Sequence, residues 1–176
     1  MLLLEYDKEN PEELSDIVEN YKLVNAGKFD VAILASSRKP VLYKNGIHVW
    51  IKTLDEENAN LMIILSYILL GHPDWSKSDI KIFDVCKKSE EASVKARMNE
   101  LIEKGRLPIT PQSVKIIIEE EGVSYKTLIN KYSTDAGLTI IGFIGENIKH
   151  PEDQTFNGYD NLGNILFVNS YEIKHI

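Results

Sequence analysis

The apolar residues of the chain recur with two periods, which predict an alternation of strands and helices. Short apolar runs and period-two alternation indicate strands, while a spacing of three to four residues indicates amphipathic helices. Strands are expected at residues 29–35, 47–51, 79–86, 114–118, 138–144 and 164–168. Helices are expected at residues 11–24, 53–70, 89–104 and 124–132.

Capping residues support several of these helices. Asn10 is a candidate N-cap for the first helix, and Gly27 follows its end. Thr53 and Glu56 form a capping-box pattern ahead of the apolar run at residues 61–70. Because that run is apolar nearly all round, we expect the helix to be covered on most of its surface.

The order of the elements predicts the fold class. From residue 47 onward strands and helices alternate, which implies right-handed crossovers and a mostly parallel sheet with helices on both faces, an α/β fold. Residues 1–27 are expected to form an acidic helical segment, and residues 28–176 a single α/β domain. The stretch 146–163 is longer than an ordinary connection, so function or mobility is expected to concentrate there.

Composition and charge narrow the class of partner. The 176 residues, 43% of them apolar and 27% charged, fit one ordinary globular domain. Of the formal net charge of −7, most lies within residues 1–20, where seven acidic residues accompany Lys8 alone. The rest of the chain is nearly neutral and has no cluster of lysine and arginine, which argues against nucleic acid as a partner. The acidic stretch is typical of a solvated helix face.

Three features predict a cytoplasmic location without membrane insertion. Cys86 is the only cysteine, and its place in an apolar alternating stretch is typical of a small buried hydrophobe in a reducing compartment. The first residues lack the basic region and long apolar core of a secretory signal. The run at residues 61–70 is about half the roughly 20 residues that a membrane-spanning helix needs.

We expect no enzyme activity, no cofactor and no metal. The four histidines, His48, His72, His150 and His175, lie on separate predicted elements without a second ligand at metal-binding spacing. Neither a Gly-x-Ser-x-Gly elbow nor a local Cys-His pair is present. The acidic runs lie at element boundaries, where structural roles explain them.

Two segments are candidates for binding phosphate. Ser36, Ser37 and Arg38 follow the first predicted strand, and Gly142 and Gly145 end a later one. In a parallel sheet both segments would face the crevice beyond the strand ends. The established phosphate-binding fingerprints are absent, so ordinary turns are the alternative that we prefer.

Trp50 is a candidate interaction residue. It shares one side of its predicted strand with His48 and Lys52, the polar alternate positions. A tryptophan at such a position either packs under a helix or contacts a partner protein.

Several strings in this order resemble the soluble C-terminal domain of cation-chloride cotransporters. They are Ile-His-Val-Trp-Ile at 47–51, the leucine-rich run at 60–70, Trp75 followed by Ile-Lys-Ile-Phe at 80–83, the stretch 128–142, and Asn-Ile-Leu-Phe-Val at 164–168. The resemblance covers roughly residues 28–176 and corresponds to the second half of that domain. In the family, the two related halves are similar to universal stress proteins.

The resemblance implies a three-layer sandwich and a non-catalytic regulatory module of a transporter similar to the sodium-potassium-chloride cotransporters. Its partners would be a second copy, as a homodimer, and the transmembrane part of a transporter in the same or a separate chain.

The alternative is a free-standing sensor of a nucleotide or small ligand, similar to universal stress proteins, that uses the five phosphate candidates. Members of that family that bind ATP carry Gly-x-x-Gly, nine residues, and then Gly-Ser or Gly-Thr. Here the next glycine after Gly145 is Gly158, followed by Tyr159, so the spacing differs.

Overall fold

The computed structural model describes residues 1–52, 56–104, 109–145, 148 and 155–174. The strands of this part are β1 (Leu2–Asp7), β2 (Val31–Ser36), β3 (Ile47–Lys52), β4 (Ile80–Cys86), β5 (Val114–Ile118), β6 (Leu138–Gly142) and β7 (Ile165–Asn169). The helices are α1 (Pro11–Ala26), α2 (Glu56–Leu70), α3 (Glu91–Lys104) and α4 (Tyr125–Ser133). Every predicted strand and helix is confirmed, with ends that differ by a few residues. Thr53 of the predicted capping box, His150 and His175 lie outside the described residues.

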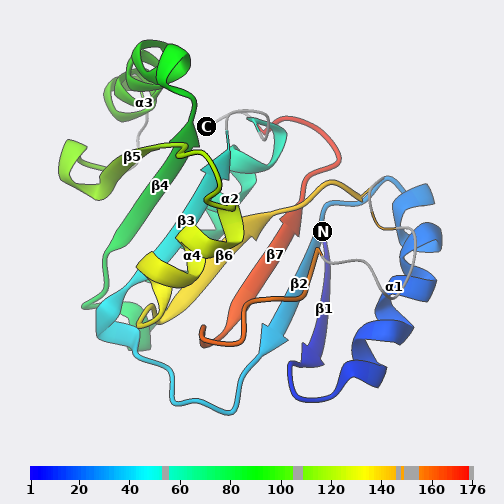
Figure 1. Ribbon diagram of the computed structural model, residues 1–176. Coiled ribbons are helices and arrows are strands. Elements are labelled where there is room, and N and C mark those ends of the chain that lie inside the picture. Colours follow the sequence, from blue (N-terminus) through cyan, green and yellow to red (C-terminus); the bar gives the residue numbers. More distant parts are fainter. Residues whose placement is uncertain (53–55, 105–108, 146–147, 149–154, 175–176) are drawn as a thin grey trace.

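Strands β3 to β7 form a parallel sheet in the order β7-β6-β3-β4-β5 (Figure 1). The chain first adds β4 and β5 on one side of β3 and then crosses back to add β6 and β7 on the other. The direction of winding therefore reverses between β3 and β6. In doubly wound sheets, ligands bind at such a reversal, beyond the carboxyl ends of the strands.

Strands β1 and β2 extend the same sheet in the opposite direction. β1 pairs in parallel with β2 along its whole length, from Leu2 opposite Val31 to Asp7 opposite Ser36, whereas β2 is antiparallel to β7. The prediction of a separate helical segment at residues 1–27 is therefore wrong, because this stretch gives the sheet β1 as well as α1. The run of leucines at its start carries no β-branched residue, which hid the strand.

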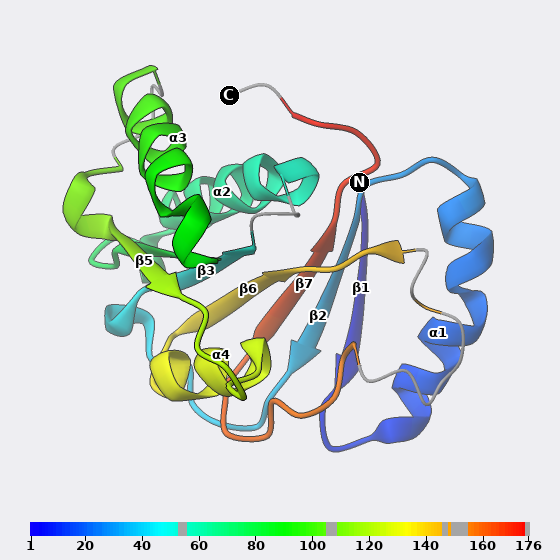
Figure 2. The same cartoon turned by 45° about the horizontal axis from the view of Figure 1, so that its top comes forward.

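Helices lie on both faces of the sheet (Figure 2). An apolar core fills the space on each face. One core joins the strands to Val18 and Tyr21 of α1 and to Leu128 and Ile129 of α4. The other joins them to Met62 and Ile63 of α2 and to Val94 and Met98 of α3. Because helices cover both faces, the central strands β3, β6 and β7 are buried at nearly every position, as in other sheets covered on both sides. The predicted three-layer α/β architecture is confirmed.

Local capping explains where two helices begin. The side chain of Asn10 accepts a hydrogen bond from the backbone N–H of Glu12 at 3.3 Å, and Ser124 Oγ accepts one from the N–H of Thr127 at 3.1 Å. Both residues therefore satisfy a backbone donor at a helix start.

Helix α2 is covered on most of its surface, as its sequence predicts, but not on all of it. Leu61, Met62, Ile63 and Leu65 are buried, whereas the side chain of Ile68 is 66% exposed. No helix in the described ranges is long and apolar enough to cross a membrane.

Candidate functional site

The five phosphate candidates lie on two sides of the sheet that correspond to opposite ends of β7. Ser36 ends β2, which runs antiparallel to β7, so Ser36 lies next to the start of β7. Gly142 ends β6 and lies opposite Val168, near the other end of β7. The two segments therefore do not share a crevice, and the prediction that both face one is wrong. It failed because it treated the first predicted strand as parallel to the later ones.

The candidates at the end of β2 are bonded to neighbouring parts of the protein. Ser36 Oγ donates to the carbonyl oxygen of Tyr6 at 3.0 Å, and the N–H of Ser37 donates to Asn164 Oδ1 at 2.8 Å. The guanidinium of Arg38 lies 3.0 Å from Asp7 Oδ2 and 3.2 Å from Glu9 Oε2. The N–H of Glu9 and the guanidinium of Arg38 hold the pKa of the Asp7 carboxyl below its usual value. These contacts give the segment a structural role that joins β1 to β2.

The candidates at the end of β6 lie at the point where the winding reverses, but protein groups pack closely there. The carbonyl oxygen of Phe143 accepts two side-chain hydrogen bonds, from Asn58 Nδ2 at 3.0 Å and from Asn169 Nδ2 at 2.9 Å. A Cβ atom added to Gly145 would lie 2.6 Å from the hydroxyl oxygen of Tyr21. Burial raises the pKa of this tyrosine to about 12. Gly145 therefore permits α1 to approach the strand end closely, rather than opening space for a phosphate group.

Two lysines that the sequence did not single out bind a loop of backbone carbonyl groups. Lys8 Nζ donates to the carbonyl oxygens of Tyr159, Leu162 and Gly163 at 3.0, 2.9 and 3.3 Å. Lys39 Nζ donates to the carbonyl oxygens of Asp160 and Asn161 at 3.3 and 3.0 Å. Together the two lysines bind the carbonyl group of every residue from 159 to 163. Burial, together with the charge of Lys39, lowers the pKa of Lys8. The two ammonium groups therefore fix the end of the long connection, where the sequence predicts function or mobility, against β1 and β2.

Trp50 is buried beneath α4 with none of its surface exposed, so the prediction of a partner contact is wrong and the packing alternative is confirmed. Its ring stacks on Phe83 with a centroid distance of 4.5 Å, and its Nε1–H donates to Ser133 Oγ at 2.8 Å. His48 Nδ1 lies 2.9 Å from the same oxygen. Burial lowers the pKa of His48 to about 4, so its imidazole is neutral at physiological pH.

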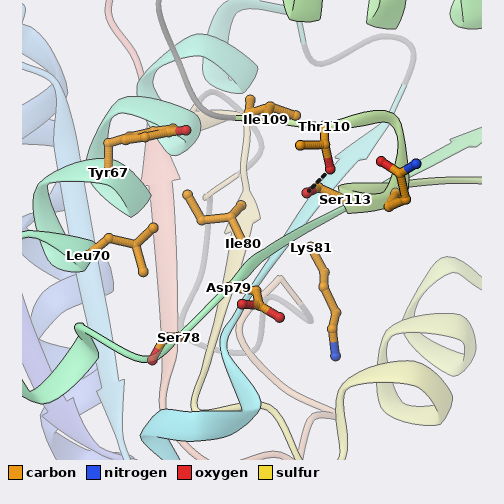
Figure 3. A pocket seen from close by; sticks show the side chains of 10 residues that line it. Tyr67, Leu70, Ser78, Asp79, Ile80, Lys81, Ile109, Thr110 and Ser113 are labelled. Carbon is orange, nitrogen blue, oxygen red and sulfur yellow. Dashed lines mark hydrogen bonds between the residues drawn. The ribbon is translucent and has the colours of Figure 1, made fainter.

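A cavity of about 480 Å³ opens between α2, the start of β4 and the segment before β5 (Figure 3). Its walls carry hydroxyl groups of Tyr67, Ser78, Thr110 and Ser113 and the aliphatic side chains of Leu70, Ile80 and Ile109. In Figure 3 the ring of Tyr67 lies on the opposite side of Ile80 from Thr110, whose hydroxyl is 3.3 Å from that of Ser113. The sequence did not indicate this cavity, because its lining comes from three separate elements.

Metal chemistry finds no support in the described part of the chain, where no three His, Cys, Asp or Glu side chains gather around a common point. Cys86 is buried, and burial raises the pKa of its thiol. This environment is typical of a structural cysteine rather than a reactive one.

The sequence matches no known protein-family model and no curated protein. Its fold is similar to that of the cytoplasmic domain of a prokaryotic cation chloride cotransporter, with a TM-score of 0.60, 16% sequence identity, and coverage of 97% of this chain and 63% of that one. It is also similar to a candidate universal stress protein from Pseudomonas aeruginosa UCBPP-PA14 and to a functionally unknown protein from Pseudomonas aeruginosa PAO1. Each of these two has a TM-score of 0.50, 15% identity, and coverage of 94% of this chain and 61% of the other.

The chain thus spans less than two thirds of the length of these solved structures. At 15–16% identity the likeness concerns the fold alone. The chain has a mostly parallel α/β fold of the kind found in the cytoplasmic domain of a cation chloride cotransporter and in a universal stress protein-like structure.

Proposed function

We propose that this chain is a non-catalytic cytoplasmic regulatory domain of a cation-chloride-type transporter, which pairs with a second copy of itself. The observation that carries the proposal is the fold likeness to a transporter cytoplasmic domain over 97% of this chain. At this coverage the likeness extends to the β1-α1-β2 unit as well as to the five parallel strands. The short strings of residues that resemble the family support the same assignment.

The placement of the reactive side chains favours a regulatory role over catalysis. Ser133 and His48 lie within hydrogen-bond distance, as in a nucleophile–base pair, but Ser133 has no exposed surface and His48 is only 3% exposed. A substrate cannot reach Ser133 Oγ without displacing α4. The Arg38 guanidinium is likewise engaged by two carboxylates.

The continuous sheet suits a domain that passes a conformational bias from one surface to another. All the described strands belong to one sheet, with β1 and β5 at its two edges. The Lys8 ammonium and the Asn58 amide tie distant parts of the chain to this frame. A contact at one edge therefore acts on a sheet that includes all the described strands, and it can alter the equilibrium of an attached membrane part.

A free-standing sensor of a small ligand is the second candidate. It is favoured by the hydroxyl-lined cavity beside Tyr67 and by the likeness to a universal stress protein-like structure. Residues just before the edge strand β5 form part of the cavity wall, so a ligand bound there would lie close to this edge of the sheet.

Sedimentation velocity of the purified chain, over about a hundredfold range of concentration with and without ATP, separates the two proposals. The regulatory-domain proposal predicts a concentration-dependent dimer that ATP does not alter. A chain that stays monomeric at every concentration contradicts self-pairing. An ATP-dependent change in mass or shape supports the sensor instead.

A further inference from the structure

Among the described residues, no strand pairs with the outer edge of β5. This strand pairs with β4 on one side and ends the sheet on the other, at the opposite margin from β1 (Figure 1). The N–H of Glu119 donates to the carbonyl oxygen of Cys86 on the β4 side. Because backbone groups alternate in direction along a strand, those of Ile116 and Ile118 point toward the open side. Such an edge is a template for another strand.

The same edge borders an apolar groove. The groove has a volume of about 520 Å³ and lies between α3 and β5. Its apolar lining consists of Met98, Ile102, Pro111, Val114, Ile116 and Ile118. The three β5 side chains among them are only partly buried, and they pack against the core beneath α3. A strand added at the edge would bring further side chains over this groove.

The charges of the edge complement those of a second copy. The sequence from Lys115 to Glu119 has a base at one end, an acid at the other and three isoleucines between them. Antiparallel pairing of two such strands about Ile117 sets Lys115 of each copy opposite Glu119 of the other. It also sets Ile116 opposite Ile118, which are the residues whose backbone groups face outward. Opposite charges at directly facing positions stabilise an antiparallel pair.

The geometry points to β5 as the surface through which two copies of this chain pair, antiparallel and centred on Ile117, so that one sheet continues through both. This inference rests on the proposed self-pairing and names its surface. A two-fold axis perpendicular to the sheet keeps α3 of both copies on the same face, so the partner's isoleucines extend the apolar lining of the groove. Main-chain hydrogen bonds then join the edges, and the two Lys115–Glu119 contacts fix the register.

The other free edge lacks this complementarity. Strand β1 contains Glu5 and Asp7 but no basic residue, and Glu12 and Glu13 follow in the first turn of α1. Pairing two β1 edges would gather acidic side chains of both copies, which is unfavourable at directly facing positions. The second copy is therefore expected at β5.

Charge reversal tests the inference by sedimentation equilibrium of the full chain. In Lys115→Glu or Glu119→Lys, like charges face each other at both contacts, and the dissociation constant of the dimer should rise by about tenfold or more. The double variant Lys115→Glu with Glu119→Lys restores opposite charges and should return the constant to within about threefold of the unmodified chain. Glu5→Lys on β1 is the matched control and should leave it unchanged.

The outcomes distinguish a failure of the β5 surface from a failure of self-pairing itself. A wild-type dimer that is insensitive to both single reversals, or one that Glu5→Lys disrupts, overturns the β5 surface while leaving self-pairing intact. A wild-type chain that is monomeric throughout overturns the proposed self-pairing itself. Within its own chain, Lys115 lies 4.1 Å from the ring centre of Tyr132, and Glu119 Oε1 lies 3.9 Å from Lys52 Nζ, so circular dichroism is recorded for each variant. Recovery in the double variant, which keeps the loss of both contacts, identifies the charge pairing as the cause.

Discussion

The ammonium group of Lys8 lies 2.9 Å from the carbonyl oxygen of Leu162, although 154 residues separate the two in the chain. This contact joins the residue after β1 to the connection that leads into β7. Together with the carbonyl oxygens of Tyr159 and Gly163, Lys8 has three backbone acceptors, which indicates a structural role.

Replacing Lys8 with methionine should destabilise the protein by about 2–3 kcal/mol, because three partly buried carbonyl groups lose a charged donor. Urea unfolding followed by circular dichroism measures this loss. Lys77→Met, at an exposed position, is the control and should change the free energy of unfolding by less than about 0.5 kcal/mol. Equal effects of the two variants would show that the Lys8 contacts contribute little.

Gly145 should not tolerate a side chain while Tyr21 is present. A Cβ atom at this position would lie 2.6 Å from the Tyr21 hydroxyl oxygen, so Gly145→Ala should cost about 1–3 kcal/mol of stability. The cost should be smaller when measured in a Tyr21→Phe background, since the closest atom is then absent. Gly163→Ala is the matched control, because its Cβ would meet its nearest atom at an ordinary 3.8 Å. Thermal unfolding of the four variants gives the comparison.

Removing Arg97 should destabilise the protein more than removing it together with its partner. Arg97 Nη2 lies 2.6 Å from Asp84 Oδ2, and the Asp84 side chain has no exposed surface. Arg97→Met leaves a buried carboxylate without this cation, at a cost of about 3–5 kcal/mol. The double variant Arg97→Met with Asp84→Leu should recover part of that loss in chemical denaturation. If the double variant loses as much unfolding free energy as Arg97→Met and Asp84→Leu lose in sum, the two side chains do not stabilise each other, and the account is contradicted.

Stability should fall as the pH drops from about 6.5 to about 4 because of His48. The folded state holds the pKa of this buried imidazole at about 4, whereas the unfolded chain titrates near 6.5, so the unfolded state binds more protons between these values. The contribution is fully present above pH 6.5, and about 3 kcal/mol is lost as the pH approaches 4. Urea unfolding across this range measures the slope. His48→Gln should flatten it, and His72→Gln, at an exposed position, should not.

Local pattern was enough to predict most of the fold. Strand β3 could be predicted from the alternation of its residue types, although the structure buries both sides of the strand. Helix α2 could be predicted from an apolar run too long for a strand. The same reasoning missed β1, because three consecutive leucines carry neither a clear period nor a β-branched residue. The acidic charge of the surrounding segment then suggested a solvated helix alone.

The candidate site depended on strand direction, which local pattern does not encode. Ser36 and Gly142 both end strands, but because β2 is antiparallel to β7 they lie near opposite ends of β7. The carbonyl contacts of Lys8 could not be predicted from the sequence either, since their acceptors are backbone atoms of residues far along the chain. The opposite charges of Lys115 and Glu119 are visible in the sequence, but the proposed pairing depends on the position of β5 at the end of the sheet.

Amide hydrogen exchange at low and high protein concentration, each with and without ATP, tests the central claim of a self-pairing domain most directly. The account predicts that exchange of the outward amides of Ile116 and Ile118 slows as concentration rises, that β1 does not change, and that ATP has no effect. Exchange that is independent of concentration, or protection by ATP near Arg38 or Gly145, would contradict it.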